Sequence, residues 1–338
     1  MAKVSVIGTT RWGTTLAMIL AHNGTEVLLL ARTQEEAAAM ESAGENQRRL
    51  PGFPFPPGMR VTASVEEATT GADMVVLVVP SHSLRENVRT LLPHLDSRSI
   101  VLSATKGLEK DSTNRMSQVL EDELPKAFHS RISVLSGPNL AKEIAQRMPA
   151  STVVASQDEE VALRVQELFM SPTFRVYTNT DVVGVEFGGA LKNIIALGAG
   201  ISDGLGYGDN GKAAFITRGL VEITRLGVAA GANPITFAGL AGLGDLVATC
   251  SSPLSRNRYV GEQLGAGRGL EEILSSMTNV AEGVDTTRGA LILASKLNVD
   301  MPLTQAISTV LFQGMDPCQA VIGLMGRAPR PEWSGNQP

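Results

Sequence analysis

The sequence has 338 residues, of which 43% are hydrophobic and 19% charged, so it holds enough apolar material for two domains of roughly 100 to 200 residues each. Its net charge of −5 leaves no general basic field, which argues against nucleic acid or an anionic membrane surface as a partner. The two cysteines, Cys250 and Cys318, and the four scattered histidines have no metal-ligand spacing, so we expect a reducing cytoplasm and no metal site.

We expect neither a signal peptide nor a membrane anchor. The apolar runs, such as residues 75–79, are far shorter than the roughly 18 residues that a membrane span needs. Met1 leads directly into a strand-like segment, which does not resemble a secretory leader.

Short apolar runs alternate with helical stretches through the first half of the chain. The runs that we expect to be strands are residues 3–8, 26–30, 73–79, 100–102 and 132–135, and the clearest helical stretches are 14–22, 34–43 and 84–92. Such alternation predicts a parallel sheet with right-handed crossovers. Runs without polar alternation, notably 73–79, are typical of strands covered on both faces. The fold class is therefore α/β, with a doubly wound, Rossmann-like domain over residues 1–180.

Two other segments depart from this alternation. Residues 45–58 contain four prolines and two glycines, which predicts a surface loop that borders the cofactor. Residues 181–327 are long stretches rich in Ala, Gly and Leu with turns near Gly206, Asn233 and Met301, which predicts an all-helical second domain. Residues 328–338 carry no periodicity and are expected to be a frayed tail.

The first predicted strand ends in a glycine motif. Gly8-Thr9-Thr10-Arg11-Trp12-Gly13 matches the dinucleotide fingerprint G-x-G-x-x-G at its first and third glycines, with Thr10 in the middle position. A threonine there either widens the turn or offers its hydroxyl to a phosphate, while a helix starting near Trp12 still supplies free N–H groups. We expect dinucleotide binding, weakened by Thr10; an ordinary strand-to-helix turn is the alternative.

Arg32 follows the second predicted strand, about 20 residues after the last glycine of the motif. An acidic residue at this position holds the ribose 2′-OH of NAD, whereas an arginine can pair with the 2′-phosphate of NADP. Arg32 therefore favours NADP over NAD. The alternative is a solvated arginine at the end of a strand.

Candidate substrate-binding residues follow the next strands. Lys106 comes after the strand at 100–102, and Gly137 and Asn139 come after the strand at 132–135. Ligands of doubly wound folds bind at the carboxyl ends of the strands, so we expect both loops to face one cleft. A surface lysine and an ordinary Gly-Pro turn remain the alternatives.

At this point the sequence resembles the bacterial NAD(P)-dependent glycerol-3-phosphate dehydrogenases over nearly its whole length. The ordered motifs that carry the resemblance are RWGTTLA, SATKG, LSGPNLAKE, GALKNIIALGAGISDGLG, GLGDLVATC, SRNR and VAEGV. The resemblance implies reversible reduction of dihydroxyacetone phosphate to sn-glycerol 3-phosphate with NADPH or NADH, in the service of glycerophospholipid synthesis. It also implies a C-terminal domain of the 6-phosphogluconate dehydrogenase type and a homodimer.

The resemblance further implies site residues at the positions that match the family's motifs. Besides the glycine motif with Gly8, Thr10 and Gly13, the cofactor-binding residues would be Arg11, Trp12, Arg32, Lys106, Ala141, Arg256, Val280 and Glu282. The substrate-binding residues would be Lys106, Gly137, Asn139, Lys192, Asp245, Ser255, Arg256 and Asn257. Lys192 would be the acid/base, with Lys106 and Asp245 as further catalytic residues. Thr10 and Asn139 depart from the family's pattern.

The surroundings of Lys192 support a catalytic role independently. The lysine lies on a helix predicted to begin near Val182, and its neighbours on the same face are Gly188, Gly189 and Ala196. We expect these small residues to leave space around the ammonium, although tight packing of another element is the alternative. Reduction of a ketone leaves alkoxide charge that a positioned proton donor must neutralise. Burial should lower the pKa of Lys192 toward neutrality.

Two further motifs fit a phosphorylated substrate. Asp245 lies in a turn framed by glycines and could orient the lysine or a substrate hydroxyl, or simply cap the next helix. Ser255, Arg256 and Asn257 precede a helical stretch over residues 258–264. A helix N-terminus with an adjacent arginine suits a phosphate, although an ordinary helix cap with a solvated arginine has the same pattern.

Two rival functions remain open from the sequence. One is a dehydrogenase of the same two-domain plan that acts on a hydroxy acid or a sugar acid. The other is a non-catalytic dinucleotide-binding protein, a hypothesis that the unusual Thr10 motivates.

Overall fold

The first domain is built on one sheet, seen in a computed structural model of the chain that describes residues 2–277, 281–329 and 331–332. The strand order across the sheet is β3-β2-β1-β4-β5-β6-β7-β8. The strands are β1 (Lys3–Ile7), β2 (Glu26–Leu30), β3 (Met59–Thr62), β4 (Met74–Leu77), β5 (Ile100–Ser103), β6 (Ile132–Ser136), β7 (Ala150–Ser156) and β8 (Phe174–Asn179). The chain winds outward from β1 in both directions, so the doubly wound prediction is confirmed.

The sheet is parallel through β1 to β6, as predicted. Val4 of β1 lies opposite Val27 of β2 and Met74 of β4. The sequence analysis did not predict β3, β7 or β8. Of these, β7 adds antiparallel to β6, with Ser133 opposite Ser156, and β8 pairs parallel with β7. The two last strands extend the sheet past β6.

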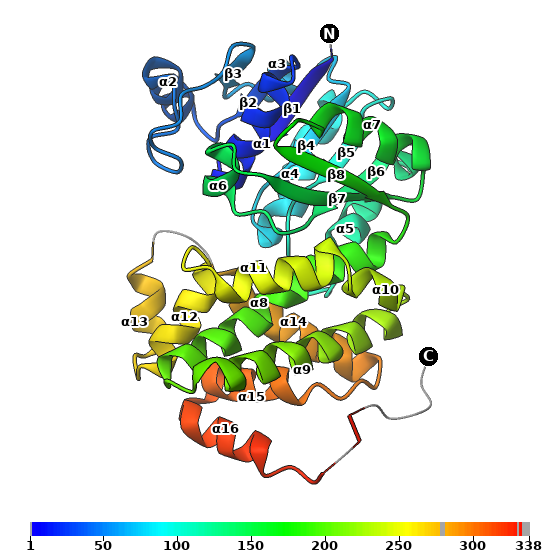
Figure 1. The fold of residues 1–338 in the computed structure, drawn as a ribbon. Helices are drawn as coiled ribbons and strands as arrows, with labels where there is room; N and C mark the ends of the chain where they lie inside the picture. Colours follow the sequence, from blue (N-terminus) through cyan, green and yellow to red (C-terminus); the bar gives the residue numbers. More distant parts are fainter. Residues whose placement is uncertain (1, 278–280, 330, 333–338) are drawn as a thin grey trace.

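Helices cover both faces of the sheet (Figure 1). They are α1 (Arg11–His22), α2 (Gln34–Ala43), α3 (Val65–Thr69), α4 (Leu84–Leu91), α5 (Met116–Glu123), α6 (Ala141–Ala145) and α7 (Glu159–Phe169), with 3-10 turns η1 (Ser81–Ser83), η2 (Leu92–His94) and η3 (Lys126–Arg131). Alternate strand residues supply two cores: Val6 packs with Leu16 of α1 on one face, whereas Ile7 packs with Val88 of α4 on the other. Burial on both faces explains why these strands lack polar alternation.

The second domain is helical, as predicted, and lies below the first in Figure 1. Its elements are α8 (Val182–Gly204), α9 (Gly208–Ala229), α10 (Pro234–Phe237), the π-helical turn η4 (Leu240–Gly244), α11 (Asp245–Ser251), α12 (Arg256–Gly265), α13 (Leu270–Ser275), α14 (Glu282–Lys296), α15 (Pro302–Gln313) and α16 (Pro317–Met325). The turns between helices fall where they were predicted. Gly206 separates α8 from α9, Asn233 is the N-cap of α10, and Met301 is the N-cap of α15.

Helix α8 is the core of this domain. It starts where β8 ends, and the Asp181 carboxylate accepts a hydrogen bond from the Gly184 N–H at 2.9 Å, which fixes the first turn. Two stretches, Val182–Gly204 and Pro234–Ser251, are long and apolar enough to cross a membrane, but 89% of the first and 44% of the second is buried inside the protein. The apolar character of α8 is therefore that of a core helix.

Glycines bring α12 into backbone contact with α8. A Cβ on Gly200 would lie 2.0 Å from the Arg258 carbonyl oxygen, and a Cβ on Gly261 would lie 1.9 Å from the Leu197 carbonyl oxygen. No larger residue fits at either position without moving a helix. The close approach lets Asn257 Nδ2 donate to Asn193 Oδ1 at 2.9 Å, so the start of α12 lies beside the middle of α8.

A buried ion pair joins the two domains. Glu186 of α8 accepts hydrogen bonds from the Arg115 guanidinium and, at 2.8 Å, from the Ser117 N–H at the start of α5. Both charged side chains are largely buried. The pair limits rotation of α8 about its axis and so fixes the direction in which Lys192, less than two turns further along, points.

Candidate active site

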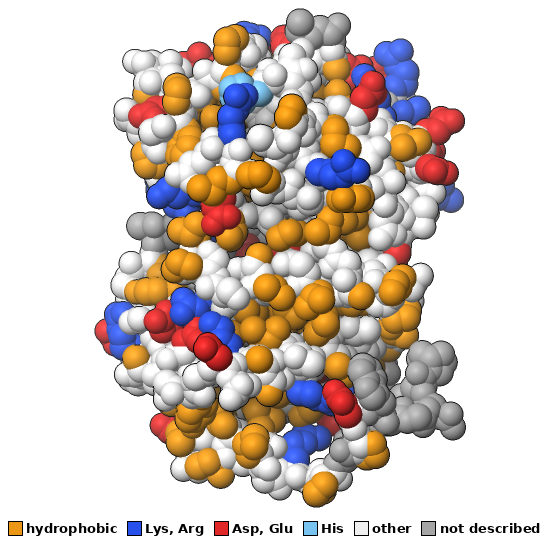
Figure 2. Space-filling model, viewed as in Figure 1, with side chains coloured by type: hydrophobic (Ala, Val, Ile, Leu, Met, Phe, Trp, Pro, Cys, Tyr) orange, Lys and Arg blue, Asp and Glu red, His pale blue; other side chains and the backbone are white. Residues whose placement is uncertain are grey.

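The candidate site lies between the domains, where the strands of the sheet end. Hydrophobic side chains gather along the waist that separates the two domains (Figure 2). Lys106, in the loop after β5, donates to the Gly137 carbonyl oxygen at 3.0 Å and to Asp245 Oδ2 at 2.7 Å. The first contact joins the loops after β5 and β6, and the second reaches α11 of the helical domain. The two loops therefore lie together, as predicted.

Asp245 holds both lysines. Its other carboxylate oxygen accepts a hydrogen bond from Lys192 Nζ, which also donates to Thr249 Oγ1 at 2.6 Å. Asp245 is only 1% exposed and Lys192 7% exposed. Two ammonium groups on one buried carboxylate leave a net positive charge, which suits a site where an oxyanion develops. Asp245 is the first residue of α11, but its carboxylate binds the lysines, so the capping alternative does not apply.

The environment of Lys192 sets its proton affinity. Burial lowers the pKa of Lys192 to about 8, although the nearby Asp245 carboxylate opposes this shift. The predicted direction is confirmed. Such a pKa lets an ammonium give up its proton near neutral pH and take it back.

The expected space beside Lys192 is largely filled by the chain itself. A Cβ on Gly188 would lie 2.4 Å from the Ala241 carbonyl oxygen, and a Cβ on Gly189 would lie 2.3 Å from Ser136 Oγ. These glycines admit the turn η4 and the end of β6 close to the helix axis. Tight packing, which the sequence left as the alternative, is the reason for both glycines.

Unpartnered polar atoms line the end of β6. Asn139 Nδ2 donates to Thr152 Oγ1 at 3.0 Å, whereas Asn139 Oδ1 and Ser136 Oγ are buried without a hydrogen-bond partner among the described residues. Gly137 between them has φ +151, and a Cβ there would lie 3.0 Å from Thr152 Cα. Buried polar atoms without partners are costly, so this strand end fits a bound polar ligand.

The motif at Ser255 starts α12 as predicted. The Ser255 hydroxyl accepts from the Arg258 N–H at 3.2 Å. The Asn257 side chain binds Asn193 through its nitrogen and accepts from the Gly283 N–H at 3.0 Å, so it is oriented from α8 and α14. Partial loss of water lowers the pKa of the Arg256 guanidinium, and the nearby Glu282 carboxylate opposes the shift. Arg256 is nevertheless an exposed residue at the first position of α12, so a helix cap with a solvated arginine stays compatible with the structure.

The glycine motif forms a strand-to-helix turn with a geometry that accepts threonine. Gly8 has φ +114, and a Cβ on Gly13 would lie 2.1 Å from the Gly8 carbonyl oxygen, so both positions require glycine. Thr10 has φ −65, which any residue can adopt, and its hydroxyl caps α1 by accepting from the Gly13 N–H at 2.9 Å. The first backbone hydrogen bond of α1 runs from the Thr14 N–H to the Thr10 carbonyl oxygen. The N–H groups of Arg11 and Trp12 come before this bond, at the N-terminal end of the helix.

The loop over residues 45–58 borders this turn. Asn46, buried, donates to the Thr9 carbonyl oxygen at 3.0 Å and to Thr14 Oγ1 at 2.8 Å. Arg11 Nε donates to the Arg49 carbonyl oxygen at 2.9 Å. The pKa of Arg49 is lowered by burial and by the positive charges of Arg48, Arg32 and Arg11. Three other arginines therefore lie near Arg49, with the Glu36 carboxylate opposing their effect on its pKa; the sequence analysis had singled out only Arg11 and Arg32 of this group.

The remaining cofactor candidates lie on elements next to this turn. Trp12 Nε1 is buried without a hydrogen-bond partner among the described residues. Thr15 Oγ1 donates to the Ala141 carbonyl oxygen at 3.3 Å, which places α6 against α1. Glu282 begins α14 and accepts from Ser81 Oγ at 2.8 Å, so it reaches the loop after β4; burial raises the pKa of its carboxyl. Val280 lies outside the described residues.

Two polar residues of the site were not found from the sequence. Thr249 lies four residues after Asp245 on α11 and so shares its face, which is a signal that could have been used. Asn193 follows Lys192 directly and points to a different neighbour, Asn257. No sequence pattern distinguished it.

Comparisons with known proteins cover nearly the whole chain. The family model described as NAD-dependent glycerol-3-phosphate dehydrogenase N-terminus matches residues 3–162, and the corresponding C-terminus model matches residues 181–322. Both the glycine motif and Lys106 fall in the first match, and Lys192, Asp245 and the Ser255 motif fall in the second.

Individual relatives agree with these models. The glycerol-3-phosphate dehydrogenase (NAD(P)+) of Dehalococcoides mccartyi is 52% identical over 338 residues, covering 100% of this chain and 94% of the relative. That of Geobacter metallireducens is 52% identical over 330 residues, covering 98% of each chain. The crystal structure of glycerol-3-phosphate dehydrogenase from Coxiella burnetii, 36% identical, superposes with a TM-score of 0.91 over 96% of this chain and 99% of that one. The chain therefore belongs to the NAD-dependent glycerol-3-phosphate dehydrogenase family.

Proposed function

We propose that the chain reduces dihydroxyacetone phosphate to sn-glycerol 3-phosphate reversibly, with the substrate bound between the domains. The observation that supports this most directly is the pair of ammonium groups, Lys106 and Lys192, held on the buried Asp245 carboxylate. A ketone oxygen placed among them would meet a cation, a hydrogen-bond donor and a transferable proton at one point. NAD(P)H, when bound, supplies the hydride for the ketone carbon.

Lys192 is proposed to donate the proton to the developing alkoxide and to take it back in the reverse direction. Asp245 and Thr249 hold Nζ from two sides, so the ammonium is oriented before the substrate arrives. Lys106 is proposed to stabilise the alkoxide charge from the other domain, together with Gly137 and Asn139 at the end of β6. Preorganised charge of this kind requires no rearrangement as the transition state forms.

The phosphate is proposed to bind at the start of α12. The first turn of this ten-residue helix offers backbone N–H groups and positive potential, and Arg256 adds a guanidinium that can form bidentate bonds. Asn257 is oriented by Asn193 and Gly283, and Ser255 fixes the turn. A substrate without the phosphate would lose the charge-assisted bonds to Arg256.

The cofactor is proposed to be held by Gly8, Arg11, Trp12, Ala141 and Glu282, with Val280 as a further contact. The residues fit a dinucleotide because Gly8 and Gly13 allow a strand-to-helix turn so tight that a Cβ at either position would overlap backbone atoms. In addition, Trp12 Nε1 has no hydrogen-bond partner in the part of the chain that the structure describes. Arg32, with Arg48 and Arg49 nearby, is proposed to favour NADP over NAD, since a 2′-phosphate would relieve the repulsion among these cations.

We further propose that this soluble enzyme acts in the cytoplasm as a homodimer and supplies glycerol 3-phosphate for glycerophospholipids. We place the boundary between its two domains at residues 180 and 181, in the link between β8 and α8, and treat residues 328–338 as a tail.

The first experiment is oxidation of NADPH and of NADH by the purified protein with dihydroxyacetone phosphate, beside dihydroxyacetone as the control. We expect oxidation that depends on the phosphate, with NADPH preferred. Equal rates with both ketones would contradict the proposed role of Arg256. Absence of oxidation while both cofactors still bind would favour a binding protein without catalysis.

A further inference from the structure

The carboxylate of Glu36 lies between two segments of the proposed cofactor site. Glu36 is the third residue of α2 and is partly buried. Its Oε1 accepts a hydrogen bond from Thr9 Oγ1 at 2.7 Å, and its Oε2 accepts from the Arg32 N–H at 3.1 Å. Thr9 belongs to the glycine turn after β1, and Arg32 follows β2. One carboxylate therefore connects the ends of the two strands that border the adenosine half of a dinucleotide.

These contacts go beyond what capping of α2 requires. Thr33 is the N-cap of α2, and its hydroxyl accepts from the Glu36 N–H at 3.2 Å. In a capping box, the side chain of the third helical residue returns to the N–H of the N-cap itself. The Glu36 side chain instead bonds the residue before the N-cap and a residue of another element. Its carboxylate is therefore held at the glycine turn as well as at the start of its own helix.

Dinucleotide-binding domains specific for NAD have a carboxylate at this corner. There an Asp or Glu about 20 residues after the glycine motif accepts a hydrogen bond from the 2′-hydroxyl of the adenosine ribose. In this chain Arg32 has that position in the sequence, and Glu36 brings a carboxylate to the same strand end from four residues further on. The corner thus contains a cation that suits a 2′-phosphate and an anion that suits a 2′-hydroxyl.

The two signs of charge act on each other at this corner. Burial and the positive charges of Arg48, Arg32 and Arg11 lower the pKa of Arg49, whereas the Glu36 carboxylate opposes this shift. Glu36 therefore reduces the positive potential that would attract a phosphate. A phosphate monoester brings about two further negative charges, which a fixed carboxylate repels, whereas a hydroxyl brings a donor that the carboxylate can accept.

We propose that Glu36 is a specificity-determining residue, which accepts a hydrogen bond from the adenosine 2′-hydroxyl of NAD and repels the 2′-phosphate of NADP. The proposal rests on the proposed binding of a dinucleotide at the glycine turn. Arg32 and Glu36 then act in opposite directions, so Glu36 limits the preference for NADP and keeps NAD as a usable cofactor. Thr9 is the positioning residue, because its hydroxyl holds Oε1.

Dissociation constants for NADH and NADPH, measured by titration calorimetry without the ketone, test this proposal. Glu36→Gln keeps the shape of the side chain and removes its charge. We expect NADPH to bind more tightly and NADH more weakly, so that the ratio of the two constants shifts by about 10-fold toward NADPH, the size of one charge-assisted hydrogen bond. Damage to α2 would instead weaken both cofactors. An unchanged ratio would overturn the proposal.

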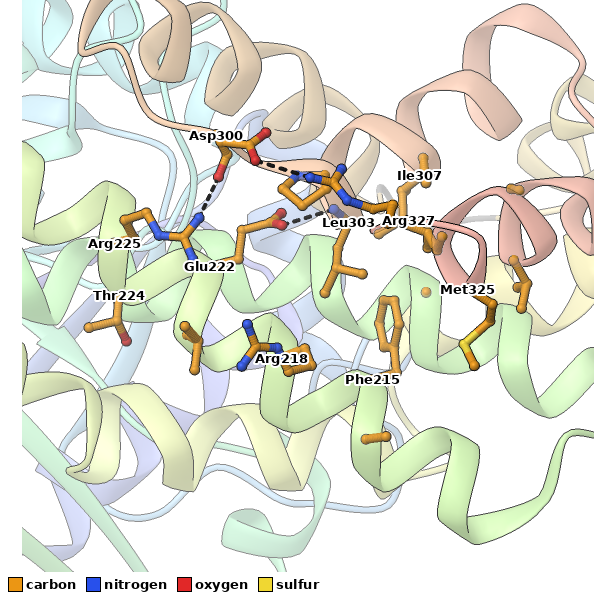
Figure 3. A pocket seen from close by; sticks show the side chains of 18 of the residues that line it. Phe215, Arg218, Glu222, Thr224, Arg225, Asp300, Leu303, Ile307, Met325 and Arg327 are labelled. Carbon is orange, nitrogen blue, oxygen red and sulfur yellow. Dashed lines mark hydrogen bonds and ion pairs between the residues drawn. The ribbon is translucent and has the colours of Figure 1, made fainter. Parts of the chain in front are cut away.

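Two matched controls remove a carboxylate at other positions. Glu35→Gln changes the preceding residue of α2, which is exposed. Asp300→Asn changes a residue of the helical domain, where the carboxylate accepts from Arg327 Nη2 at 3.2 Å beside a groove of about 1320 Å³ (Figure 3). Both variants should keep the wild-type ratio. An equal shift in either control would show that net charge acts rather than the position of Glu36, and would overturn the proposal.

A cofactor analogue tests the same contact in the unaltered protein. NADH without the adenosine 2′-hydroxyl should bind roughly 5- to 10-fold more weakly than NADH to the wild-type chain. Glu36→Ala should bind the two equally, because the acceptor is gone. Equal affinities in the wild type, or a difference that persists in Glu36→Ala, would overturn the proposal. The wild-type comparison decides the question even if circular dichroism shows that the variants do not fold.

These measurements separate the role of Glu36 from the proposed function. If both cofactors bind and Glu36→Gln leaves their ratio unchanged, the role of Glu36 is overturned and the proposed function stands. If the ratio shifts as expected in a protein that does not reduce dihydroxyacetone phosphate, the role of Glu36 is supported and the proposed function is contradicted. A wild-type chain that binds neither cofactor would overturn both.

Discussion

Asp245→Asn should move the pH dependence of ketone reduction to lower pH. Reduction needs Lys192 protonated, so its rate should be highest below the pKa of about 8 and fall as pH rises through it. The Asp245 carboxylate raises this pKa by favouring the ammonium, whereas Lys106 and burial lower it. An asparagine keeps the shape and removes the negative charge, so the lysine should lose its proton more easily.

The size of the shift follows from the geometry. Two unit charges about 4 Å apart interact by about 4 kcal/mol at an effective dielectric constant of 20, which corresponds to about 3 pKa units at 1.36 kcal/mol each. Water that enters beside the asparagine side chain would restore part of the lost stabilisation of the Lys192 ammonium. We therefore expect an acidic displacement of about one unit or more.

The assay is kcat/KM for dihydroxyacetone phosphate between pH 5 and 10, since this quantity reports groups of the free enzyme. The matched control is Asp96→Asn, which removes a surface carboxylate paired with Arg98 and should leave the profile unchanged. Circular dichroism must show that both variants fold. The alkaline limb of the profile is the fall in kcat/KM at high pH. If this limb stays at its position in Asp245→Asn or moves to higher pH, its assignment to Lys192 under the control of Asp245 is refuted.

Three further predictions test other parts of the structure. Lys192→Ala should lower kcat by about 10² to 10⁴, the usual contribution of a positioned proton donor, while titration calorimetry finds NADPH binding unchanged; near-normal turnover would remove Lys192 from the mechanism. Arg32→Asp should weaken binding of NADPH relative to NADH by roughly 10- to 100-fold, because a charge-assisted hydrogen bond contributes about 1.5–3 kcal/mol; an unchanged ratio of dissociation constants would contradict the NADP preference. Gly261→Ala should destabilise the protein by about 1–3 kcal/mol through overpacking against the Leu197 carbonyl, whereas Gly323→Ala, in a helix with open space around it, should stabilise it by about 0.5–1 kcal/mol. Equal melting temperatures for these two variants would contradict the packing account of α8 and α12.

The sequence predicted the parts of the fold that have a strong local pattern. Strands β1, β2, β4, β5 and β6 are apolar on both faces and were found within a few residues. The missed strand β3 has four residues directly after a proline-rich loop, and β8 alternates buried with exposed residues at the sheet edge. Both are strands because of the neighbour that they pair with, and that information is absent from a local window.

The candidate site likewise has a part that the sequence predicted and a part that it could not predict. The positions of Lys106, Lys192 and Asp245 followed from the ends of strands and from a family resemblance, but their convergence on one carboxylate depends on the packing of three elements from two domains. Thr10 was expected to weaken dinucleotide binding because the motif was compared residue by residue, and that expectation stays a prediction. The Thr10 φ of −65 means that a side chain is tolerated, and this cannot be deduced from the letter at that position.

The bond between Lys106 and Asp245 has a consequence for movement of the two domains. The same contact that assembles the proposed reacting charges also joins the two halves of the molecule, so separating the domains at this point must separate a largely buried cation from a buried anion. A substitution that breaks this ion pair therefore changes both the arrangement of charges in the site and the contact between the domains.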